Sequence, residues 1–195
     1  MNCDSLDNIV LPESVIEIRE GAFCQCRNLK DITLPNNLTS LASSLFSGCD
    51  NLSEFVIPES VTIICSHAFC DCTNLSQLVT PESVTTICSY AFCDCTSLKS
   101  ITIPKYVYSI EAKAFDGCSS LQYIYCKPTT PPKIYYRYGS NSKYGALPQN
   151  DNILIYVSRD AYNTYLQYSY PGYGVDKTSA ENWYFYKSYI APYDF

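Results

Sequence analysis

Residues 58–80, PESVTIICSHAFCDCTNLSQLVT, and residues 81–103, PESVTTICSYAFCDCTSLKSITI, are near copies of each other and follow one another directly in the chain. The same spacing of 23 residues relates whole series of identical residues on either side: Pro12, Pro35, Pro58, Pro81 and Pro104; Phe23, Phe46, Phe69, Phe92 and Phe115; Cys26, Cys49, Cys72, Cys95 and Cys118; Leu29, Leu52, Leu75, Leu98 and Leu121. A fixed period of this size is typical of a repeat solenoid, in which each coil contacts its neighbours. We therefore predict a solenoid over residues 1–127, formed by a partial first coil and five repeats.

Each repeat is expected to contain one principal strand. Asp31-Ile32-Thr33-Leu34 alternates polar and apolar residues, which is the period of a half-buried strand, and Pro35 ends it. We expect strands within Leu29–Leu34 and Leu98–Ile103, a second short extended piece at Val61–Ile64, and a tight helical turn at the Ala-Phe-x-x-Cys sequence that follows. The sequence thus indicates a solenoid with a parallel sheet.

A single coil cannot fold by itself. It buries about seven apolar side chains, each worth about 1.5 to 3 kcal/mol, whereas ordering its backbone costs about 1 to 2 kcal/mol for each residue. Stacking the coils at the strand spacing of about 4.8 Å places each phenylalanine on the next one, so neighbouring coils supply the missing burial.

The repeat motif Pro-x-Ser-Val-x-x-Ile-x-x-x-Ala-Phe-x-x-Cys-x-x-Leu-x-x-Ile-x-Ile resembles the BspA-like leucine-rich repeat family of bacterial surface and secreted proteins. The repeats depart from it at Asn37-Leu38 in place of Ser-Val, at Leu45 in place of Ala, and at Thr80 and Cys126 in place of the last Ile. The resemblance implies a right-handed superhelix of 23-residue coils. It also implies a non-enzymatic scaffold that binds a protein partner in adhesion or host contact.

The first residues of the chain bear on where the protein is located in or outside the cell. Counting back one period from Cys26 and Leu29 gives Cys3 and Leu6, so the chain begins within a coil, and we expect upstream sequence before it. Met1 is followed by no signal segment, and no apolar run of about 18 residues could span a membrane. Together with the resemblance, this predicts a protein of the cell surface or extracellular space whose signal peptide lies outside this sequence.

The tail, residues 128–195, differs in composition from the repeats. It begins with the stiff segment Pro128-Thr129-Thr130-Pro131-Pro132 and contains fourteen of the nineteen tyrosines. We expect a strand at Ile153–Val157, then a helix that Ser158 caps and that carries Ala161, Tyr162, Tyr165 and Leu166 at helical spacing. A second helix is expected over Glu181–Ile190, capped by Ser179, with Trp183, Tyr186 and Ile190 along one face. Two roles stay open for this small α+β region: a cap over the end of the solenoid, or a tyrosine-rich surface that binds a partner or stacks on a carbohydrate.

The twelve cysteines invite a metal or disulfide interpretation. The second cysteine of each Cys-x-Cys pair belongs to the inward series, and the Cys-x-x-Cys pairs of zinc sites do not occur, so we expect no metal. Equivalent cysteines in adjacent coils come close enough for a disulfide, which would join Cys70 to Cys93 or Cys65 to Cys88. Free thiols and such disulfides both stay open at this point.

Catalytic and cofactor sites are not indicated. The net charge of −6 argues against nucleic acid, and residues 1–127 carry 14 acidic and 7 basic side chains, which favours cationic or neutral partners. The single histidine, His67, occupies a variable repeat position that we expect to face solvent, and Glu59 and Glu82 are expected to form a solvated column. No phosphate loop, dinucleotide motif or nucleophile elbow occurs, so we expect no cofactor.

The outward side of the principal strands is the predicted binding surface. Its two columns read Asn8, Asp31, Glu54, Gln77, Ser100, Tyr123 and Val10, Thr33, Val56, Val79, Thr102, Tyr125. The residues that we expect to contact a partner are Thr33, Glu54, Val56, Gln77, Val79, Thr102, Tyr123 and Tyr125. A protein is the expected partner, and a glycan that binds the tail tyrosines is the alternative.

Overall fold

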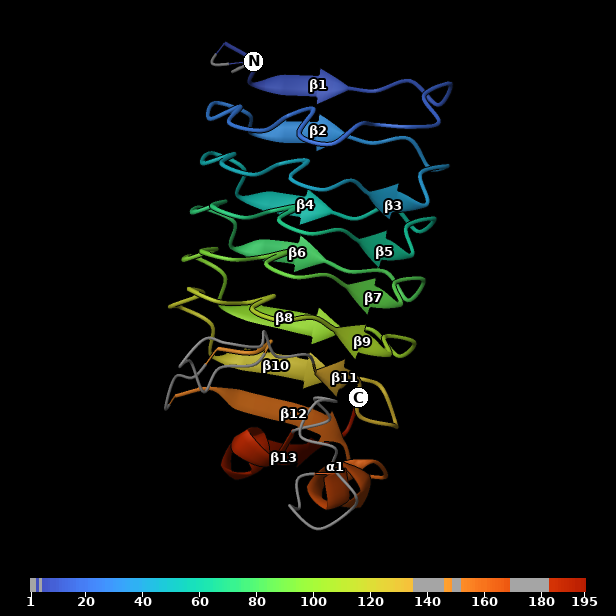
Figure 1. The fold of residues 1–195 in the computed structure, drawn as a ribbon, viewed down its shortest axis with the longest axis vertical. Helices are drawn as coiled ribbons and strands as arrows, with labels where there is room; N and C mark the ends of the chain where they lie inside the picture. Colours follow the sequence, from blue (N-terminus) through green and yellow to red (C-terminus); the bar gives the residue numbers. More distant parts are fainter. Residues whose placement is uncertain (1–2, 4, 135–145, 149–151, 169–182) are drawn as a thin grey trace.

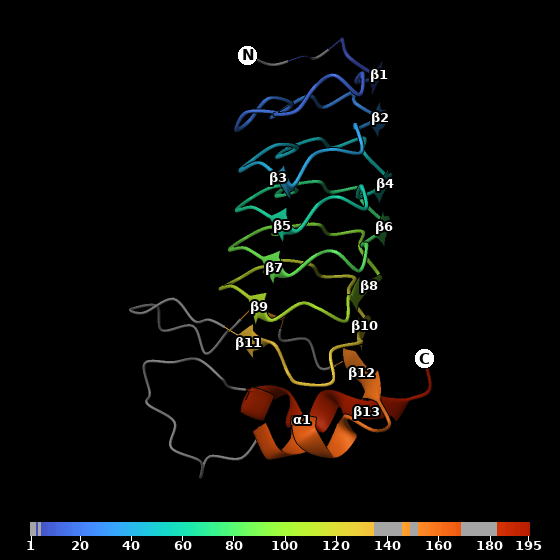
Figure 2. The same ribbon diagram turned by 90° about the vertical axis from the view of Figure 1, so that its right-hand side faces the viewer.

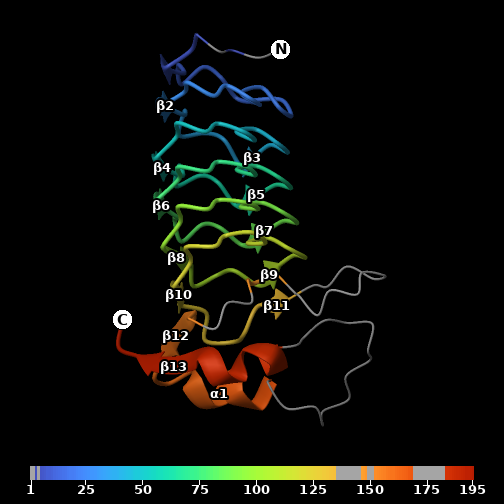
Figure 3. The ribbon, with the colours of Figure 1, turned by 90° about the vertical axis from the view of Figure 1, so that its left-hand side faces the viewer.

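The computed structural model shows a stack of coils with the two chain termini towards opposite ends (Figure 1). It describes residues 3, 5–134, 146–148, 152–168 and 183–195. Two rows of short parallel strands run along the stack, on different sides of it (Figures 2 and 3). The predicted solenoid is confirmed.

The first row contains the principal strand of each coil. Its members are β1 (Asn8–Val10), β2 (Asp31–Thr33), β4 (Glu54–Val56), β6 (Gln77–Val79), β8 (Ser100–Ile103), β10 (Tyr123–Cys126), β12 (Leu154–Ser158) and β13 (Ile190–Tyr193). β1 pairs with β2, β4 with β6 and β8 with β10, each in register 23 residues apart, as Asn8 with Asp31 and Tyr123 with Ser100. The strands expected within Leu29–Leu34 and Leu98–Ile103 are therefore present.

The second row is one continuous parallel sheet of two-residue strands. It consists of β3 (Ser40–Leu41), β5 (Ile63–Ile64), β7 (Thr86–Ile87), β9 (Ser109–Ile110) and β11 (Lys133–Ile134). β5 confirms the extended piece expected at Val61–Ile64. β11 pairs with β9, and β12 pairs with β10, so both rows continue beyond residue 127.

The Ala-Phe-x-x-Cys segment is not the helical turn that the sequence suggested. His67 and Asp71 have positive φ angles of 58° and 60°, and Gly48 and Gly117 occupy the Asp71 position in other coils, also with positive φ. Left-handed residues four apart interrupt any helix. The segment instead alternates tight turns with hydrogen bonds to the next coil: the backbone N–H groups of His67, Phe69 and Asp71 donate to the carbonyls of Ser89, Ala91 and Cys93. These bonds form a third ladder along the stack.

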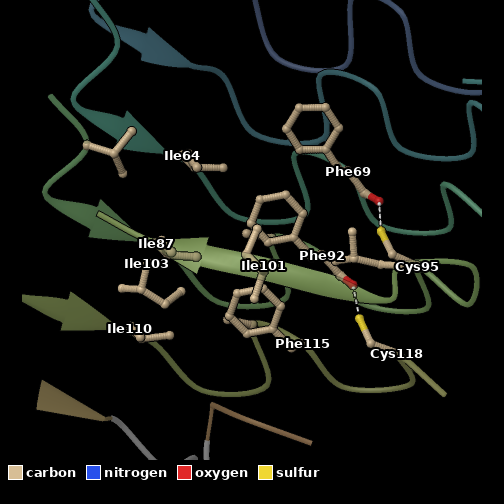
Figure 4. Packing of buried hydrophobic residues seen from close by; sticks show 14 of the residues in the cluster. Ile64, Phe69, Ile87, Phe92, Cys95, Ile101, Ile103, Ile110, Phe115 and Cys118 are labelled. Atoms are coloured by element: carbon tan, nitrogen blue, oxygen red, sulfur yellow. Dashed lines mark hydrogen bonds between the residues drawn. The ribbon is translucent and has the colours of Figure 1, made fainter. Parts of the chain in front are cut away.

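The core lies between these three ladders and is shared by all coils. Phe46, Phe69, Phe92 and Phe115 are fully buried and stacked, with ring centroids 5.3 to 5.4 Å apart. Figure 4 shows part of this row beside Ile64, Ile87 and Ile110. The predicted phenylalanine series is therefore a continuous column. Neighbouring coils complete the burial that no single coil achieves.

The inward cysteines make a repeated hydrogen bond between coils. The thiol of Cys95 donates to the carbonyl of Phe69 at 3.1 Å, and the thiol of Cys118 donates to that of Phe92 at 3.0 Å (Figure 4). Cys49 and Cys72 make the same bond to Phe23 and Phe46. Each bond reaches back 26 residues into the preceding coil, so the cysteine column joins neighbouring coils.

The tail ends the stack with a strand, a helix, a 3-10 helix and a strand. β12 extends the first row, α1 (Tyr162–Tyr168) follows it, and η1 (Trp183–Tyr189) leads into β13. The side chain of Ser158 accepts a hydrogen bond from the N–H of Ala161 at 3.3 Å, which confirms the expected cap. The second helix was expected over Glu181–Ile190 as an ordinary helix. It is a 3-10 helix, and Ile190 begins a strand; the expected cap, Ser179, lies outside the described residues.

Three large side chains of the tail pack beneath the last coil. Tyr165, Trp183 and Tyr186 are fully buried, and each donates its polar hydrogen to a backbone carbonyl, of Pro128, Pro132 and Leu147 respectively, at 2.9 to 3.0 Å. α1 lies directly below the stack in Figures 2 and 3. These hydrogen bonds lie within the tail, and the pairing of β12 with β10 joins the tail to the last repeat. The capping role of the tail stays a prediction.

Candidate functional site

The first row of strands presents one outward surface, which we call the strand face. Its in-register pairing brings the predicted site residues into columns: Glu54 beside Gln77, Val56 beside Val79, and Thr102 beside Tyr125. Val56 and Val79 are 69% and 57% exposed, values that leave these apolar side chains free to contact a partner. Thr33, at the same repeat position, is also exposed.

Five aromatic side chains meet at the C-terminal end of the strand face. We call Tyr123, Tyr125, Tyr156, Tyr193 and Phe195 the aromatic patch. Tyr125 lies 5.3 Å from Tyr156 and 5.6 Å from Tyr193 between ring centroids, and Phe195 lies 5.2 Å from Tyr193. Tyr123, Tyr193 and Phe195 are 37%, 41% and 54% exposed, so the patch is a surface cluster and not part of the core.

The patch is assembled from the last repeat and from the tail. Tyr123 and Tyr125 point outward from β10, Tyr156 is the register partner of Tyr125 on β12, and Tyr193 ends β13. At its margin Arg159 makes two hydrogen bonds of 3.1 Å to the carboxylate of Asp194. Burial raises the pKa of Tyr125, and the neighbouring phenols raise it further, so its hydroxyl stays protonated at neutral pH.

A second feature of the strand face is a groove between β2 and β4. These two strands share no strand ladder, although each pairs with its other neighbour, β1 or β6. The groove has a volume of about 410 Å³ and is lined by β2 and β4 together with Leu34, Asn36 and Pro58. Its charged lining residues are Asp31 and Glu54, and we call it the acidic groove. Ile32 on its floor is half-buried, as are Ile9 and Leu78 at the same repeat position, whereas Ile101 and Ile124 are buried.

Four carboxylates of the described residues form an ion pair, and those of the acidic groove are not among them. Asp50, Glu82, Asp116 and Asp194 each form an ion pair with a lysine or an arginine. Within the part of the chain that the structure describes, Asp31 and Glu54 form none. Both residues are exposed, so the groove is a local excess of negative charge on the strand face.

The remaining candidate sites are explained by the repeat architecture. His67 is exposed, as expected, and its ring stacks on that of Tyr90 at 4.9 Å. Glu82 is bonded more closely than a solvated column implies, because it accepts hydrogen bonds from the Lys105 N–H and the Lys127 ammonium. Glu59 is exposed.

All twelve cysteines lie in the described residues, and all are free thiols. The thiols of Cys70 and Cys93, one of the two pairs considered for a disulfide, donate instead to the carboxylates of Asp71 and Asp94. Burial raises the pKa of Cys49 and of Cys118 to about 12, which makes them poor nucleophiles.

Metal-binding clusters and membrane-spanning helices are both absent from the described residues. These residues contain no group of three or more histidine, cysteine or acidic side chains arranged to hold a metal ion. They also contain no helix long and apolar enough to cross a membrane.

Three residues of the aromatic patch were not predicted from the sequence. Tyr156 alternates with the buried Ile155 and Val157 in the expected tail strand, and this alternation was a usable signal. No alternation of this kind pointed to Tyr193 and Phe195, and the strand that ends at Tyr193, β13, was not predicted. Leu154, 39% exposed beside Tyr123, was missed for the same reason as Tyr156.

Comparison with known proteins agrees with this architecture. The family model described as "BspA type Leucine rich repeat region (6 copies)" matches residues 1–130. No match was found among curated proteins.

Among solved structures, a leucine-rich repeat protein from Eubacterium ventriosum is 33% identical with a TM-score of 0.55, and the match covers 58% of this chain and 31% of that one. The T. pallidum leucine-rich repeat protein is 29% identical with a TM-score of 0.59, over 60% of this chain and 57% of that one. A leucine-rich repeat protein from Bacteroides ovatus shares the fold at 21% identity and a TM-score of 0.53, over 81% of this chain and 46% of that one. The chain thus spans about a third to a little over half of the length of these structures. Its repeats, their parallel ladders and the family match together show that the chain belongs to the BspA-type leucine-rich repeat family.

Proposed function

We propose that this protein is a non-enzymatic interaction scaffold of the cell surface or extracellular space, and that it binds another protein through its strand face in adhesion or host contact. Proteins of this family are generally interaction scaffolds without enzymatic activity. The observation that carries the proposal is the aromatic patch, where five aromatic side chains cluster on an exposed surface. Tyrosine and phenylalanine are enriched where proteins bind one another.

The composition of the surface around the patch favours a protein over a glycan. The exposed apolar residue Leu154 lies beside Tyr123 of the patch, and Arg159 and Asp194 at its margin are already bonded to each other. Protein interfaces combine an apolar centre with a polar rim. Carbohydrate binding by the tail tyrosines is the second candidate, because Tyr156 and Tyr193 of the tail are part of the same cluster.

Binding of the purified chain to a protein array and to a glycan array tests this proposal. We expect protein ligands, and we expect the double variant Tyr123→Ala/Tyr125→Ala to weaken their binding at least about tenfold, because buried aromatic anchors are worth about 2 kcal/mol or more at interfaces. The matched control is Tyr106→Ala/Tyr108→Ala. These two tyrosines are 60% and 62% exposed in the segment between β8 and β9, away from the strand face.

The control variant should bind like the wild type. If the double variant in the patch retained full binding, the strand face would not be the binding surface. Ligands found on the glycan array alone would support the second candidate and contradict the first.

A further inference from the structure

We propose that the partner of the strand face presents an extended polypeptide segment with a cationic side chain and, about five residues away, an apolar or aromatic one. The segment lies along the axis of the stack, with the cation in the acidic groove and the apolar anchor on the aromatic patch. This inference rests on the proposed function, since it specifies the chemistry of the protein that binds there.

The acidic groove has the properties of a site for a lysine or arginine side chain. Asp31 and Glu54 lie on its two walls, on β2 and β4, and no lysine or arginine of the described residues neutralises them. Between them lie Ile32 and Phe55, which offer an apolar floor for the methylene stem of such a side chain. Two carboxylates in a groove whose other lining residues are uncharged select positive charge from a partner.

The size of the groove supports the same occupant. Its volume of about 410 Å³ exceeds that of one extended side chain, so a guanidinium or ammonium group enters with its water and without displacing the coils. Ile32 and Phe55, the middle residues of the two strands, line the groove, so its floor is formed by residues that pack in the core.

The distance between the acidic groove and the aromatic patch determines how far apart the cationic residue and the apolar anchor of the partner segment must be. The strands β4, β6, β8 and β10 follow one another along the strand face, so Glu54 and Tyr123 are three strands apart in the same column. Counted from the middle of the groove, the distance is three and a half strand spacings of about 4.8 Å, or about 17 Å. An extended chain advances about 3.3 Å for each residue, so the two anchors are about five positions apart, with four residues between them.

The exposed valines between the two sites are consistent with one continuous contact. Val56 borders the groove and Val79 follows it towards the patch, both more than half exposed. A partner segment anchored at both ends therefore passes over these exposed valines, and its binding buries no unpaired charge between the two anchors.

The test uses synthetic peptides and the intact chain. The probe is a capped, fluorescent peptide in which an arginine and a tryptophan are separated by four serine or threonine residues. One comparison peptide carries glutamate in place of arginine, and another carries the arginine next to the tryptophan. We expect the probe to bind at least tenfold more tightly than either, with an affinity that falls as salt is raised.

Charge variants then locate the cation. Asp31→Asn/Glu54→Gln should weaken binding of the probe about tenfold and should remove most of its salt dependence. The matched control, Glu17→Gln/Glu20→Gln, removes two exposed carboxylates as well, but Glu17 occupies the repeat position of Ser40 in the second row of strands, so it lies away from the strand face. This control should bind like the wild type.

Three results would overturn the inference. They are equal binding of the glutamate peptide, equal losses in both charge variants, and full binding by Asp31→Asn/Glu54→Gln. The proposed function is tested separately from this inference. If binding of the array ligands depended on Tyr123 and Tyr125 but not on Asp31 and Glu54, the proposed function would be supported and this inference would be wrong.

Discussion

The inward cysteine of each repeat shows what one side chain contributes to this fold. Its size suits the crowded interior, and its thiol also has a specific partner, the carbonyl of a phenylalanine in the preceding coil. Alanine would fill less space and could not donate, whereas serine would bury a more strongly polar group. The repetition of this bond in four coils explains why cysteine recurs at a position where most apolar residues would fit.

Replacing Cys95 by alanine should lower the free energy of unfolding by about 1 to 2 kcal/mol, because both a buried hydrogen bond and buried volume are lost. Urea denaturation measures this change. Cys65→Ala is the control, since Cys65 is only half-buried and should cost less than about 0.5 kcal/mol. Equal losses in the two variants would show that the thiol bond contributes nothing.

The direction of that bond could not be predicted from the sequence. The series of buried cysteines followed directly from the period, but the position of the accepting carbonyl depends on the left-handed turn residues. Gly48 and Gly117 were the available signal, because glycine readily takes the positive φ that Asp71 and Asp94 adopt at the same repeat position. Non-glycine residues in most coils hid this signal.

At the scale of elements, the strands of the repeats could be predicted from the sequence, whereas η1 and β13 at the end of the tail could not. β12 and α1 were predictable because Ile155 and Val157 alternate with polar residues and Ser158 provides a cap. η1 was mistaken for an ordinary helix, although the three-residue interval between Trp183 and Tyr186 also fits a 3-10 helix, in which residues three apart align. β13 contains Pro192, a residue that normally argues against a strand and is tolerated at the edge of a sheet.

Trp183 packs in the buried aromatic cluster of the tail, against Tyr165 and Tyr186, and allows a direct test of what that cluster contributes to stability. Trp183→Phe removes the N–H that donates to the carbonyl of Pro132 at 2.9 Å, inside a fully buried contact. We expect a loss of about 1 to 3 kcal/mol in unfolding free energy, since a buried carbonyl loses its donor. Circular dichroism during urea denaturation measures it. Tyr106→Phe, at an exposed site, should change stability by less than about 0.5 kcal/mol. An unchanged stability in Trp183→Phe would show that this buried hydrogen bond does not stabilise the tail.

At the scale of the whole molecule, the column of buried thiols makes stability depend on pH. Burial raises the pKa of Cys49 and Cys118 to about 12, whereas an unfolded thiol titrates near about 8.5. Above that lower value the unfolded chain releases protons that the folded chain keeps. The stabilisation is therefore complete below about pH 8.5 and is lost progressively as the pH rises towards 12.

Unfolding free energies measured in urea at pH 7, 9 and 10.5, with a reductant present, should fall across this series. The variant Cys49→Ala/Cys118→Ala should be less stable at pH 7 and should lose less stability between pH 9 and 10.5, because two of the titrating groups are gone. A stability that stays constant up to pH 10.5 would be incompatible with buried protonated thiols.

The ladder of turn residues gives the stack a built-in electrical direction. The turn N–H groups all point towards the following coil, and the carbonyls that receive them point back, so the peptide dipoles add along the molecule as they do in a helix. One extremity of the ladder consequently presents carbonyl oxygens and the other presents N–H groups. At the N–H extremity, the carbonyl of Ala146 in the tail accepts a hydrogen bond from the N–H of Phe115. The two extremities of this ladder are therefore chemically unlike, and the stack of coils is polar along its axis.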